Sequence, residues 1–390
     1  MSSSVLILGG GGVGRAIGLD FVLQGLSVTI ADKDEKRLML LKEEMPSLKT
    51  LYMDLRKEES LDEKSIWPYD LVINALPGAI GYKVLTKLIS CGKNVVDVSF
   101  FPEDPFLLNE LAMQKGVTAI VDAGIAPGLC NLLLGYHIGQ MNVESYECLV
   151  GGLPVERSWP YQYKAPFSLT DVIEEYTRPV KQRLNGKEII KPPLSDVELV
   201  EIHGVGTLEA FNTDGLRTLL RTTQVPNLKE KTLRYPGHAE CIRILQATGL
   251  FSAEAILING HPVRPIEVAY ELLRRVWALS PNDKDLLIMR VRIEGWKEGR
   301  YIQYEYQLHD EADLAHSISA MARTTGYTCA ALASLLLSRS DFPKGVIAPE
   351  QLGGKEGVLS YVLSYLSNRD INLQGGKPRE GLGNNPQGNA

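Results

Sequence analysis

The fold of the chain is decided near its start by Val5-Leu6-Ile7-Leu8-Gly9-Gly10-Gly11-Gly12-Val13-Gly14. An apolar strand is followed there by the spacing Gly9-x-Gly11-x-x-Gly14 and then by an apolar helix, which is the order of the dinucleotide-binding fingerprint. The first glycine makes a tight turn, the second lets the backbone approach a pyrophosphate, and the third lets the helix pack closely on the strand. The helix N-terminus offers N–H groups and a partial positive charge to the phosphates. We therefore predict that a dinucleotide contacts Gly9, Gly11, Gly12, Val13 and Gly14.

A carboxylate after the second strand indicates which dinucleotide binds. Residues 27–31 form a predicted strand that ends in Asp32, where a carboxylate accepts hydrogen bonds from the ribose hydroxyls of NAD and repels the 2′-phosphate of NADP. Basic residues follow and could offset that repulsion, but we interpret them as the solvated start of a helix: Lys33, Lys36 and Arg37. The sequence therefore predicts NAD, with NADP as the less favoured cofactor.

Composition and charge narrow the class of protein. The 390 residues are 44% hydrophobic and 23% charged, which is typical of a globular protein with a full core, and the length suggests two domains. A net charge of -6 gives no reason to expect nucleic acid or an anionic membrane as a partner. The first strand starts within four residues, which leaves no room for a signal peptide. Five scattered cysteines without C-x-x-C spacing indicate reduced thiols and no zinc or other metal site. We therefore expect a cytoplasmic protein without a membrane span.

Polar residues follow nearly every strand predicted in the first 125 residues. These strands alternate with helical stretches and end, in order, at Gly9, Asp32, Asp54, Asn74, Asp97 and Asp122. Such alternation predicts an α/β fold with a doubly wound parallel sheet of the Rossmann type, in which ligands bind beyond the carboxyl ends of the strands. We expect Asp54 near the adenine, Asn74-Ala75-Leu76 near the nicotinamide-side ribose, and Asp97 in the same crevice. The alternative is that Asp and Asn simply favour strand exits and helix caps.

The pattern changes beyond about residue 128 to that of a second, mixed α/β substrate domain. Antiparallel strands are predicted at residues 145–150, 286–293 and 301–308, with a hairpin loop at 294–299, and helices at 239–250 and 265–279. A helix of small residues at about 315–337 is expected to return to the first domain. The predicted division is 1–127, completed by about 315–352, for the dinucleotide-binding domain and 128–314 for substrate binding and dimerisation. The segment 367–390 has no apolar face and is expected to be disordered.

One carboxylate is placed for chemistry at the junction of the two domains. Asp122 ends a predicted strand, and a turn through Gly124, Pro127 and Gly128 follows it. A carboxylate beside the nicotinamide could hold a substrate ammonium or accept a proton before hydride leaves. The alternative is a hinge carboxylate that caps the following turn.

Two motifs of the second domain supply further candidates. Asp214-Gly215-Leu216-Arg217-Thr218 contributes Asp214 and Arg217, and Arg234-Tyr235-Pro236-Gly237-His238 contributes Arg234 and His238. A guanidinium suits bidentate binding of a substrate α-carboxylate, so Arg217, Arg234 and the neighbouring Asp214 are predicted to bind substrate. His238 begins a predicted helix and is a candidate general base, although a lone histidine is more often structural.

Taken in order, these motifs make the chain resemble the saccharopine dehydrogenase-like family. The resemblance covers about residues 4–352 and rests on the glycine stretch and on five further segments, 74–77, 122–128, 214–218, 234–238 and 321–324. Within the family, the lysine 6-dehydrogenase branch is the most similar, particularly over residues 150–154 and 232–240. The resemblance implies a discontinuous Rossmann domain, a homodimer, and oxidation of a C–N bond of an amino acid by a pyridine nucleotide.

For this chain the resemblance implies oxidative deamination of the ε-amine of L-lysine to the semialdehyde, which cyclises. Asp122 and His238 are then the candidates for moving a proton. The glutamate-forming saccharopine enzymes carry an aspartate where this chain has Ala126, which weakens assignment to that branch. A saccharopine dehydrogenase, a carboxynorspermidine-type reductase and a non-enzymatic NAD-binding regulatory protein remain the alternatives.

Overall fold

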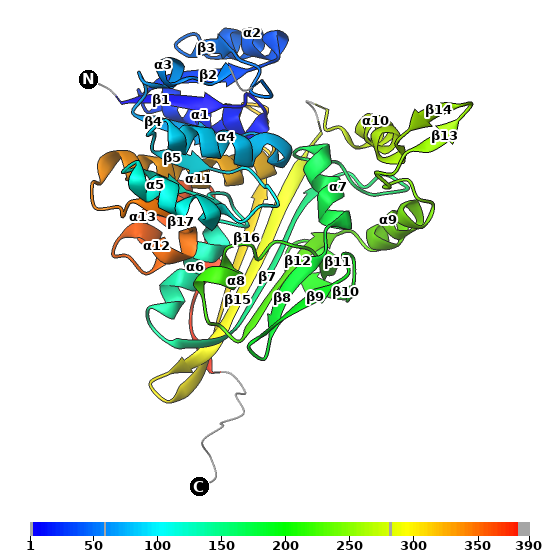
Figure 1. Cartoon of the computed structure of the whole chain (residues 1–390). Coiled ribbons are helices and arrows are strands. Elements are labelled where there is room, and N and C mark those ends of the chain that lie inside the picture. The colour runs from blue at the N-terminus through cyan, green and yellow to red at the C-terminus, as the bar shows by residue number, and fades with distance from the viewer. Residues whose placement is uncertain (1–2, 58–59, 281–282, 381–390) are drawn as a thin grey trace.

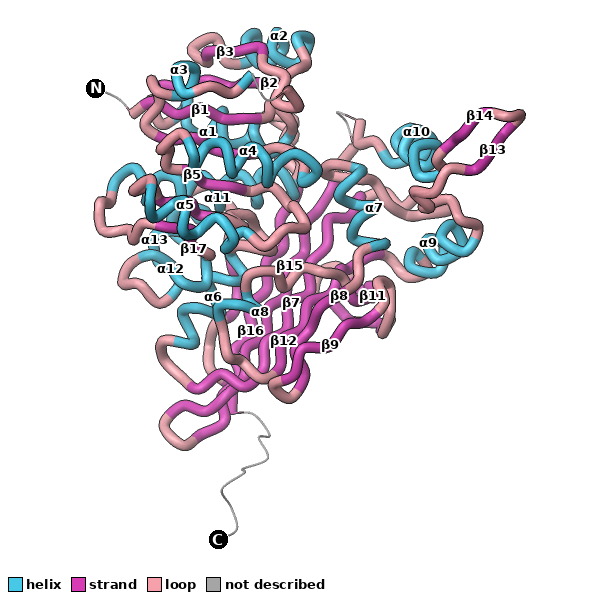
Figure 2. Tube along the Cα trace, viewed as in Figure 1, coloured by secondary structure: helices cyan, strands magenta, loops and turns pink. Residues whose placement is uncertain are grey.

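The computed structural model describes residues 3–57, 60–280 and 283–380 of the chain (Figure 1). In the tube view of the same orientation, the short strands of a first sheet are stacked at the upper left and the long strands of a second sheet run below them (Figure 2). No helix in these ranges is long and apolar enough to cross a membrane.

The first sheet is parallel throughout, and its strands have the order β17-β6-β5-β4-β1-β2-β3. Its members are β1 (Ser4–Leu8), β2 (Ser27–Asp32), β3 (Lys49–Tyr52), β4 (Leu71–Asn74), β5 (Val95–Asp97), β6 (Thr118–Ile120) and β17 (Gly345–Ile347). Successive side chains of β1 enter cores on opposite faces, Ile7 in one and Leu8 in the other, as expected when helices cover both faces. The predicted Rossmann fold is confirmed.

Helices connect these strands on both faces of the sheet. They are α1 (Gly12–Leu23), α2 (Glu35–Glu44), α3 (Glu63–Ile66), α4 (Gly78–Ser90), the 3₁₀ turn Pro105–Leu108 and α5 (Asn109–Gln114). The chain returns to this sheet through α11 (Ala320–Ser338), which packs on α1. The two helices approach closely at Gly326, where a Cβ would lie 3.1 Å from that of Ala16. We propose that residues 1–127 with 315–352 form one domain and residues 128–314 the other.

The second sheet is mixed and, over the described ranges, has ten strands. They are β7 (Asn142–Pro154), β8 (Val180–Leu184), β9 (Lys187–Lys191), β10 (Glu198–Ile202), β11 (Gly206–Asn212), β12 (Asn227–Arg234), β15 (Asp285–Lys297), β16 (Arg300–Glu311), β18 (Leu373–Gly375) and β19 (Arg379–Glu380). One face packs its apolar side chains, Val291 and Ile293 among them, into the core shared with the first domain. Helices next to this sheet are α6 (Leu129–Ile138), α8 (Leu219–Thr222), α12 (Pro349–Gly353) and α13 (Val358–Ser367).

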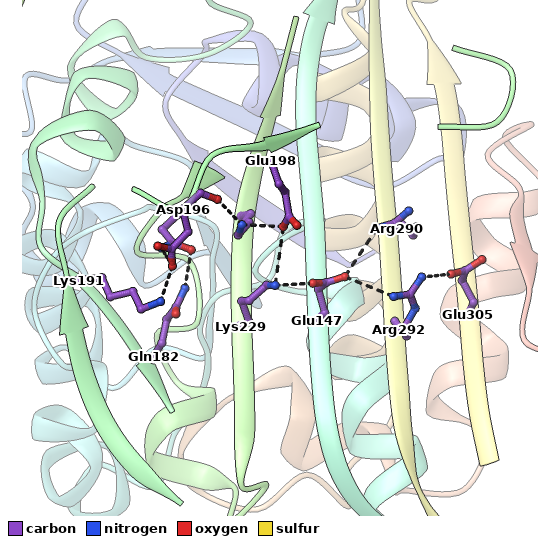
Figure 3. Close-up of polar contacts among 11 residues, drawn as sticks. Glu147, Gln182, Lys191, Asp196, Glu198, Lys229, Arg290, Arg292 and Glu305 are labelled. Carbon is purple, nitrogen blue, oxygen red and sulfur yellow. Dashed lines mark hydrogen bonds and ion pairs between the residues drawn. The ribbon is translucent and has the colours of Figure 1, made fainter. Parts of the chain in front are cut away.

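The other face of this sheet carries a ladder of ion pairs (Figure 3). Glu147 of β7 accepts from Lys229 of β12 at 2.8 Å and lies 3.7 Å from Arg290 of β15. Arg292 in turn pairs with Glu305 of β16 at 2.9 Å. The alternation of apolar and charged residues along β15 therefore matches the two environments of the sheet.

A group of helices and a short hairpin projects at the right of Figure 1 and has a small apolar cluster of its own. These are α7 (Leu169–Thr177), α9 (His238–Ala247), β13 (Ile256–Ile258), β14 (His261–Val263) and α10 (Pro265–Trp277). Val172, Ile173 and Tyr176 of α7 pack there against Trp277 of α10. This packing fixes which face of α7 points away from the cluster.

The hairpin loop and the returning helix have other bounds than the sequence predicted. The hairpin loop is not residues 294–299, because β15 continues to Lys297 and only Glu298 and Gly299, with φ of 50° and 77°, form the turn. The returning helix begins at Ala320, where Ser319 caps it, and residues 312–319 form a loop instead.

The expected disorder from residue 367 is wrong for residues 367–380. β18 and β19 pair with the edge strand β16, and Ile371 is buried, so backbone hydrogen bonds and one apolar side chain order a segment that lacks an apolar face. Residues 381–390 lie outside the described part of the chain.

Candidate functional site

A large cleft of about 1260 Å³ lies beyond the carboxyl ends of the parallel strands. The glycine loop lines one end, and α7, β12 and the loop after β11 line the other. Residues 312–319 and the start of α11 complete one wall. The cleft therefore joins the predicted dinucleotide site to the second domain.

The glycine loop has the geometry that a dinucleotide needs. Gly9 has a φ of 100°, and a Cβ on it would lie 2.5 Å from the carbonyl oxygen of Ala75. A Cβ on Gly14 would lie 1.9 Å from the carbonyl oxygen of Gly9, so only glycine lets α1 pack this closely. Around Gly11 no atom of the described residues lies within 4 Å of a Cβ position, which leaves the loop open to the cleft. The N-terminus of α1 therefore fits a pyrophosphate.

The adenosine end of the cleft combines carboxylates with arginines. Asp32 accepts a hydrogen bond from the N–H of Gly10 at 2.7 Å and pairs with Arg37 at 3.1 Å. Hydrogen bonds from the N–H groups of Asp34 and Gly10 and the charge of Arg37 together outweigh burial and lower the pKa of Asp32. Asp54 pairs with Arg56 at 2.6 Å, and both residues line the cleft.

The loop after β4 is divided between the cleft and the core. Ala75 and Leu76 line the cleft as predicted, but Asn74 and Asp97 are completely buried beneath it. The side-chain amide of Asn74 donates to Asp97 and, at 3.0 Å, to the carbonyl oxygen of Gly81. Burial raises the pKa of Asp97 to about 8, against the opposing hydrogen bonds from Asn74 and Ser99. Both residues support the loop from below and do not line the cleft.

Asp122 and Arg217 form a buried ion pair between the two domains. The Nε atom of Arg217 donates to Oδ1 of Asp122 at 2.8 Å, and its Nη1 donates to the carbonyl oxygen of Phe101. The rings of Phe100 and Phe101 lie 4.9 and 5.1 Å from the guanidinium carbon. Asp122 lines the cleft and Arg217 does not, so this arginine holds the carboxylate instead of facing the substrate position.

Arg234 is the predicted arginine that lines the cleft. It lies at the end of β12, above the ring of Tyr163, and its Nη2 lies 3.1 Å from the carboxylate of Glu175. Its side chain is 3% exposed, and its Nε and Nη1 donate to the Tyr176 hydroxyl at 3.3 Å and to the carbonyl oxygen of Leu233 at 2.9 Å. Asp214 also lines the cleft and accepts from the N–H of Lys181 at 3.2 Å.

The structure does not place His238 in the cleft. Both ring nitrogens are occupied, Nε2 by the hydroxyl of Tyr176 and Nδ1 by the carbonyl oxygen of Tyr161, each at 2.9 Å. Burial and the nearby Arg234 lower the pKa of His238 to about 3, so the ring is neutral. The geometry therefore gives His238 a structural position beneath α7 and removes its support as a general base.

On α7 and β12, three carboxylates line the cleft that the sequence analysis did not name. Asp171 and Glu175 lie one turn apart on α7, on a face adjacent to that of the buried Val172 and Tyr176, and Glu230 lies on β12. The alternation of apolar and acidic residues in α7 was the available signal, but only the packing of this helix shows where its acidic face points. Glu230 accepts from Thr213 at 2.9 Å and from the N–H of Gly215 at 3.1 Å.

At the end of the cleft near α7 and β12, side chains that carry a carboxyl group outnumber arginines. The cleft-lining carboxylates of this end are Asp122, Asp171, Glu175, Asp214 and Glu230, and the arginines are Arg234 and Arg274. Burial raises the pKa of Glu230 well above its ordinary value and raises that of Asp171 to about 7. A cation brought into this end would favour the ionised forms of both groups. Among the described ranges, no group of His, Cys, Asp and Glu could hold a metal ion.

Two family models match most of the chain. Residues 5–120 match the family model described as the saccharopine dehydrogenase NADP binding domain, and residues 124–371 match the saccharopine dehydrogenase C-terminal domain. The mitochondrial alpha-aminoadipic semialdehyde synthase of Rattus norvegicus is 25% identical over 64% of this chain, and the match spans 28% of its own length. The saccharopine dehydrogenase (NADP(+), L-glutamate-forming) of Pyricularia oryzae is 25% identical over 65% of this chain and 59% of its own.

A solved structure shares the whole architecture. The apo saccharopine dehydrogenase (L-Glu forming) from Saccharomyces cerevisiae superposes with a TM-score of 0.77 and covers 97% of this chain and 100% of its own. The sequence identity is 18%, so this match concerns the fold.

Proposed function

Because the chain belongs to the saccharopine dehydrogenase family, we propose that it is a nicotinamide-dinucleotide-dependent oxidoreductase that oxidises a C–N bond of an amino acid. The observation that carries the proposal is one continuous cleft, which runs from the open glycine loop to a carboxylate-rich pocket containing Asp122. A dinucleotide held along this cleft would bring its nicotinamide past Ala75 and Leu76 toward that pocket.

The substrate that suits this pocket best is L-lysine, oxidised at the carbon that bears its ε-amine. Lysine has one carboxylate, for which Arg234 is the buried partner, and two ammonium groups that match the carboxylates of the pocket. Saccharopine has additional carboxylates, and Arg274 is the one further lining arginine described at this end, so their binding would cost free energy. The acidic excess therefore favours lysine deamination over saccharopine cleavage.

Each residue of the pocket has a separate task in this reaction. Arg234 binds the α-carboxylate and fixes the reach of the aliphatic chain. Asp122, held by Arg217, places a negative charge beside the reacting carbon and stabilises the iminium cation that forms when hydride leaves. The bound nicotinamide would accept that hydride. Water then adds to the imine and releases ammonia, which leaves the semialdehyde and its cyclic form.

We propose NAD as the cofactor and NADP as the alternative. Asp32 lines the cleft at the end of β2, where its carboxylate suits the ribose hydroxyls and opposes a 2′-phosphate. Arg37 and Arg56 are already paired with Asp32 and Asp54, which reduces the charge that they offer to a phosphate. The matched domain is described as NADP-binding, which supports the alternative. Replacement of Asp32 by serine should shift the ratio of kcat/KM values toward NADP.

We also propose that the protein is a homodimer and that it is cytoplasmic. The dimer is supported by apolar side chains on the projecting elements, where Leu257 is 76% exposed and Leu272 and Val276 are about half exposed. Light scattering of the purified protein would measure the assembly directly.

Parallel turnover assays test the proposed function against its alternatives. Purified protein is offered L-lysine, saccharopine and carboxynorspermidine, each with NAD and with NADP, and the reduced cofactor is followed. Turnover of lysine with NAD supports the proposal. Turnover only of saccharopine or only of carboxynorspermidine would move the chain to one of those branches. Binding of NAD without any turnover would favour a regulatory protein.

A further inference from the structure

Asp171 occupies an unusual position for a carboxylate that does not belong to an ion pair in the described chain. It lies in the first turn of α7, lines the cleft, and is 5% exposed. Its Oδ1 atom is buried and has no hydrogen-bond partner within the ranges that the structure describes. A buried carboxylate oxygen without a partner costs free energy, so its retention here calls for a function.

The position of α7 brings this carboxylate to the nicotinamide end of the cleft. Val172 and Tyr176 anchor α7 in the small apolar cluster, which turns the faces of Asp171 and Glu175 toward the first domain. The N–H of Gly78, at the start of α4, is close enough to the Asp171 carboxyl group to favour its ionised form. Gly78 directly follows the loop of Ala75 and Leu76 that lines the cleft. Asp171 therefore connects the substrate domain to the end of the cofactor loop.

The charges around Asp171 favour its neutral form. Glu174 and Glu175 lie on the same helix, Tyr270 faces it from α10, and the Ser168 hydroxyl and the N–H of Gly78 are its donors. Burial and the two glutamates raise the pKa of Asp171 to about 7, although both donors oppose this change. Asp122 differs, because the guanidinium of Arg217 is in contact with it.

We propose that Asp171 is the proton acceptor for the substrate amine, a role that rests on the proposed function. The inference stands on its place in the cleft and on its buried, unpartnered oxygen. An ammonium nitrogen cannot release hydride from its carbon until it has lost a proton and regained a lone pair. In this proposal Asp122 stays ionised and stabilises the iminium cation, whereas Asp171 accepts and releases the proton of the amine.

The step balances in protons and electrons. The N–H bond of the substrate ammonium breaks, and its proton joins Oδ1 of ionised Asp171. The amine lone pair then forms the C=N bond as the C–H pair leaves the carbon as hydride to the bound dinucleotide. The protonated Asp171 returns its proton to water before the next turnover.

The substitution Asp171→Asn tests this role, with Glu174→Gln as the matched control. Glu174 lies on the same helix and pairs with Arg178, but it does not line the cleft. In the wild-type protein, kcat/KM for lysine should rise with pH through about 7 as Asp171 ionises. Asp171→Asn should lower kcat by about 100-fold or more and remove this rise. Glu174→Gln should keep kcat and keep the rise, displaced to lower pH because a like charge near Asp171 is removed.

A binding measurement supplies a readout that does not depend on turnover. L-Lysine is titrated calorimetrically into the protein with bound NADH at about pH 6. The titration is made in two buffers that differ in their enthalpy of ionisation, and the difference in binding heat gives the number of protons released. Wild-type protein should release more protons on binding than Asp171→Asn, because the ammonium favours the ionised carboxylate. NADH affinity should be equal in both.

The outcomes separate the two proposals. Retained turnover with an unchanged pH profile in Asp171→Asn would overturn the role of Asp171 and leave the proposed function intact. Equal proton release by the two proteins would also overturn it, because a residue that merely caps α7 would change stability and not protonation. Wild-type protein that reduces NAD with none of the amines and binds no lysine would overturn both proposals.

Discussion

The Nε atom of Arg217 donates to Oδ1 of Asp122 at 2.8 Å, and this contact joins the loop after β11 to the end of β6. Both side chains are nearly inaccessible, at 6% and 1% exposure, so the pair is a buried connection between the two domains. Because its guanidinium is directed to Asp122 and Phe101, Arg217 does not line the cleft, although it was predicted to bind substrate.

Removal of one partner of this pair should destabilise the fold. Arg217→Met leaves a buried carboxylate without its cation, and the free energy of unfolding should fall by about 3–5 kcal/mol in denaturant titrations. The double variant Asp122→Asn with Arg217→Met should recover much of this loss but not the activity. Equal stability of wild type and Arg217→Met would contradict a buried, mutually dependent pair.

The glycine loop provides a contrast between two alanine substitutions. Gly14→Ala places its Cβ 1.9 Å from the carbonyl oxygen of Gly9, so the protein should unfold at a lower temperature. Gly11→Ala meets no described atom within 4 Å, so the fold should remain stable while dinucleotide affinity falls. Thermal unfolding and NADH fluorescence titration would measure the two effects. Tight NADH binding by Gly11→Ala would argue against a pyrophosphate at this loop.

Arg234→Lys tests the binding of the substrate carboxylate. The ammonium of lysine keeps the positive charge but loses the bidentate geometry of guanidinium. The KM for L-lysine should rise by about 10-fold or more, whereas turnover of cadaverine, which lacks the carboxylate, should change little. Arg243→Lys, outside the cleft, serves as the control. An equal effect on both substrates would assign Arg234 a structural role only.

The buried His238 should make stability depend on pH. Its folded-state pKa of about 3 lies below the value of about 6.5 in an unfolded chain, so between these values only the unfolded chain binds the proton. Its contribution to stability is therefore present above about pH 6.5 and is lost as the pH falls toward 3, by up to about 1.4 kcal/mol per pH unit. Unfolding of wild type and His238→Gln at about pH 7 and 5 should show a weaker pH dependence in the variant. The exposed His261 provides a control, His261→Gln, which should keep the wild-type dependence.

The ion-pair ladder of Figure 3 should contribute little to stability. Glu147 contacts Lys229, Arg290 and Arg292 on a partly exposed face, and such pairs are weakened by solvent and salt. Glu147→Gln should lower the free energy of unfolding by less than about 1 kcal/mol, and added salt should reduce the difference. A large loss that is independent of salt would indicate that this face is covered in solution.

Much of the first domain could be predicted from local sequence patterns. The glycine spacing and the polar residues at the strand ends predicted the parallel sheet and the cleft edge, because both depend on short stretches of chain. The same rules could not separate Asp32, which lines the cleft, from Asp97, which lies beneath it. Both follow parallel strands, and only the packing of the loop after β4 distinguishes them.

The pocket of the second domain depends on contacts between distant segments. Asp171 and Arg217 reach the cleft or its floor only because α7 packs on α10 and the loop after β11 meets β6. Histidine is a common general base, but both ring nitrogens of His238 are hydrogen-bonded to Tyr161 and Tyr176. These two residues lie more than sixty positions away in the sequence. Residue type therefore predicted candidates, and tertiary packing selected among them.

The central claim is that hydride passes from the amine-bearing side-chain carbon of a cationic amino acid to a dinucleotide in this cleft. The most direct measurement uses L-lysine with deuterium at C6 and identifies the label in the reduced cofactor by mass spectrometry. The account predicts reduced NAD that carries one deuterium, formed with a primary isotope effect on the transfer step. Reduced cofactor without deuterium, or labelled only from lysine with deuterium at Cα, would contradict it.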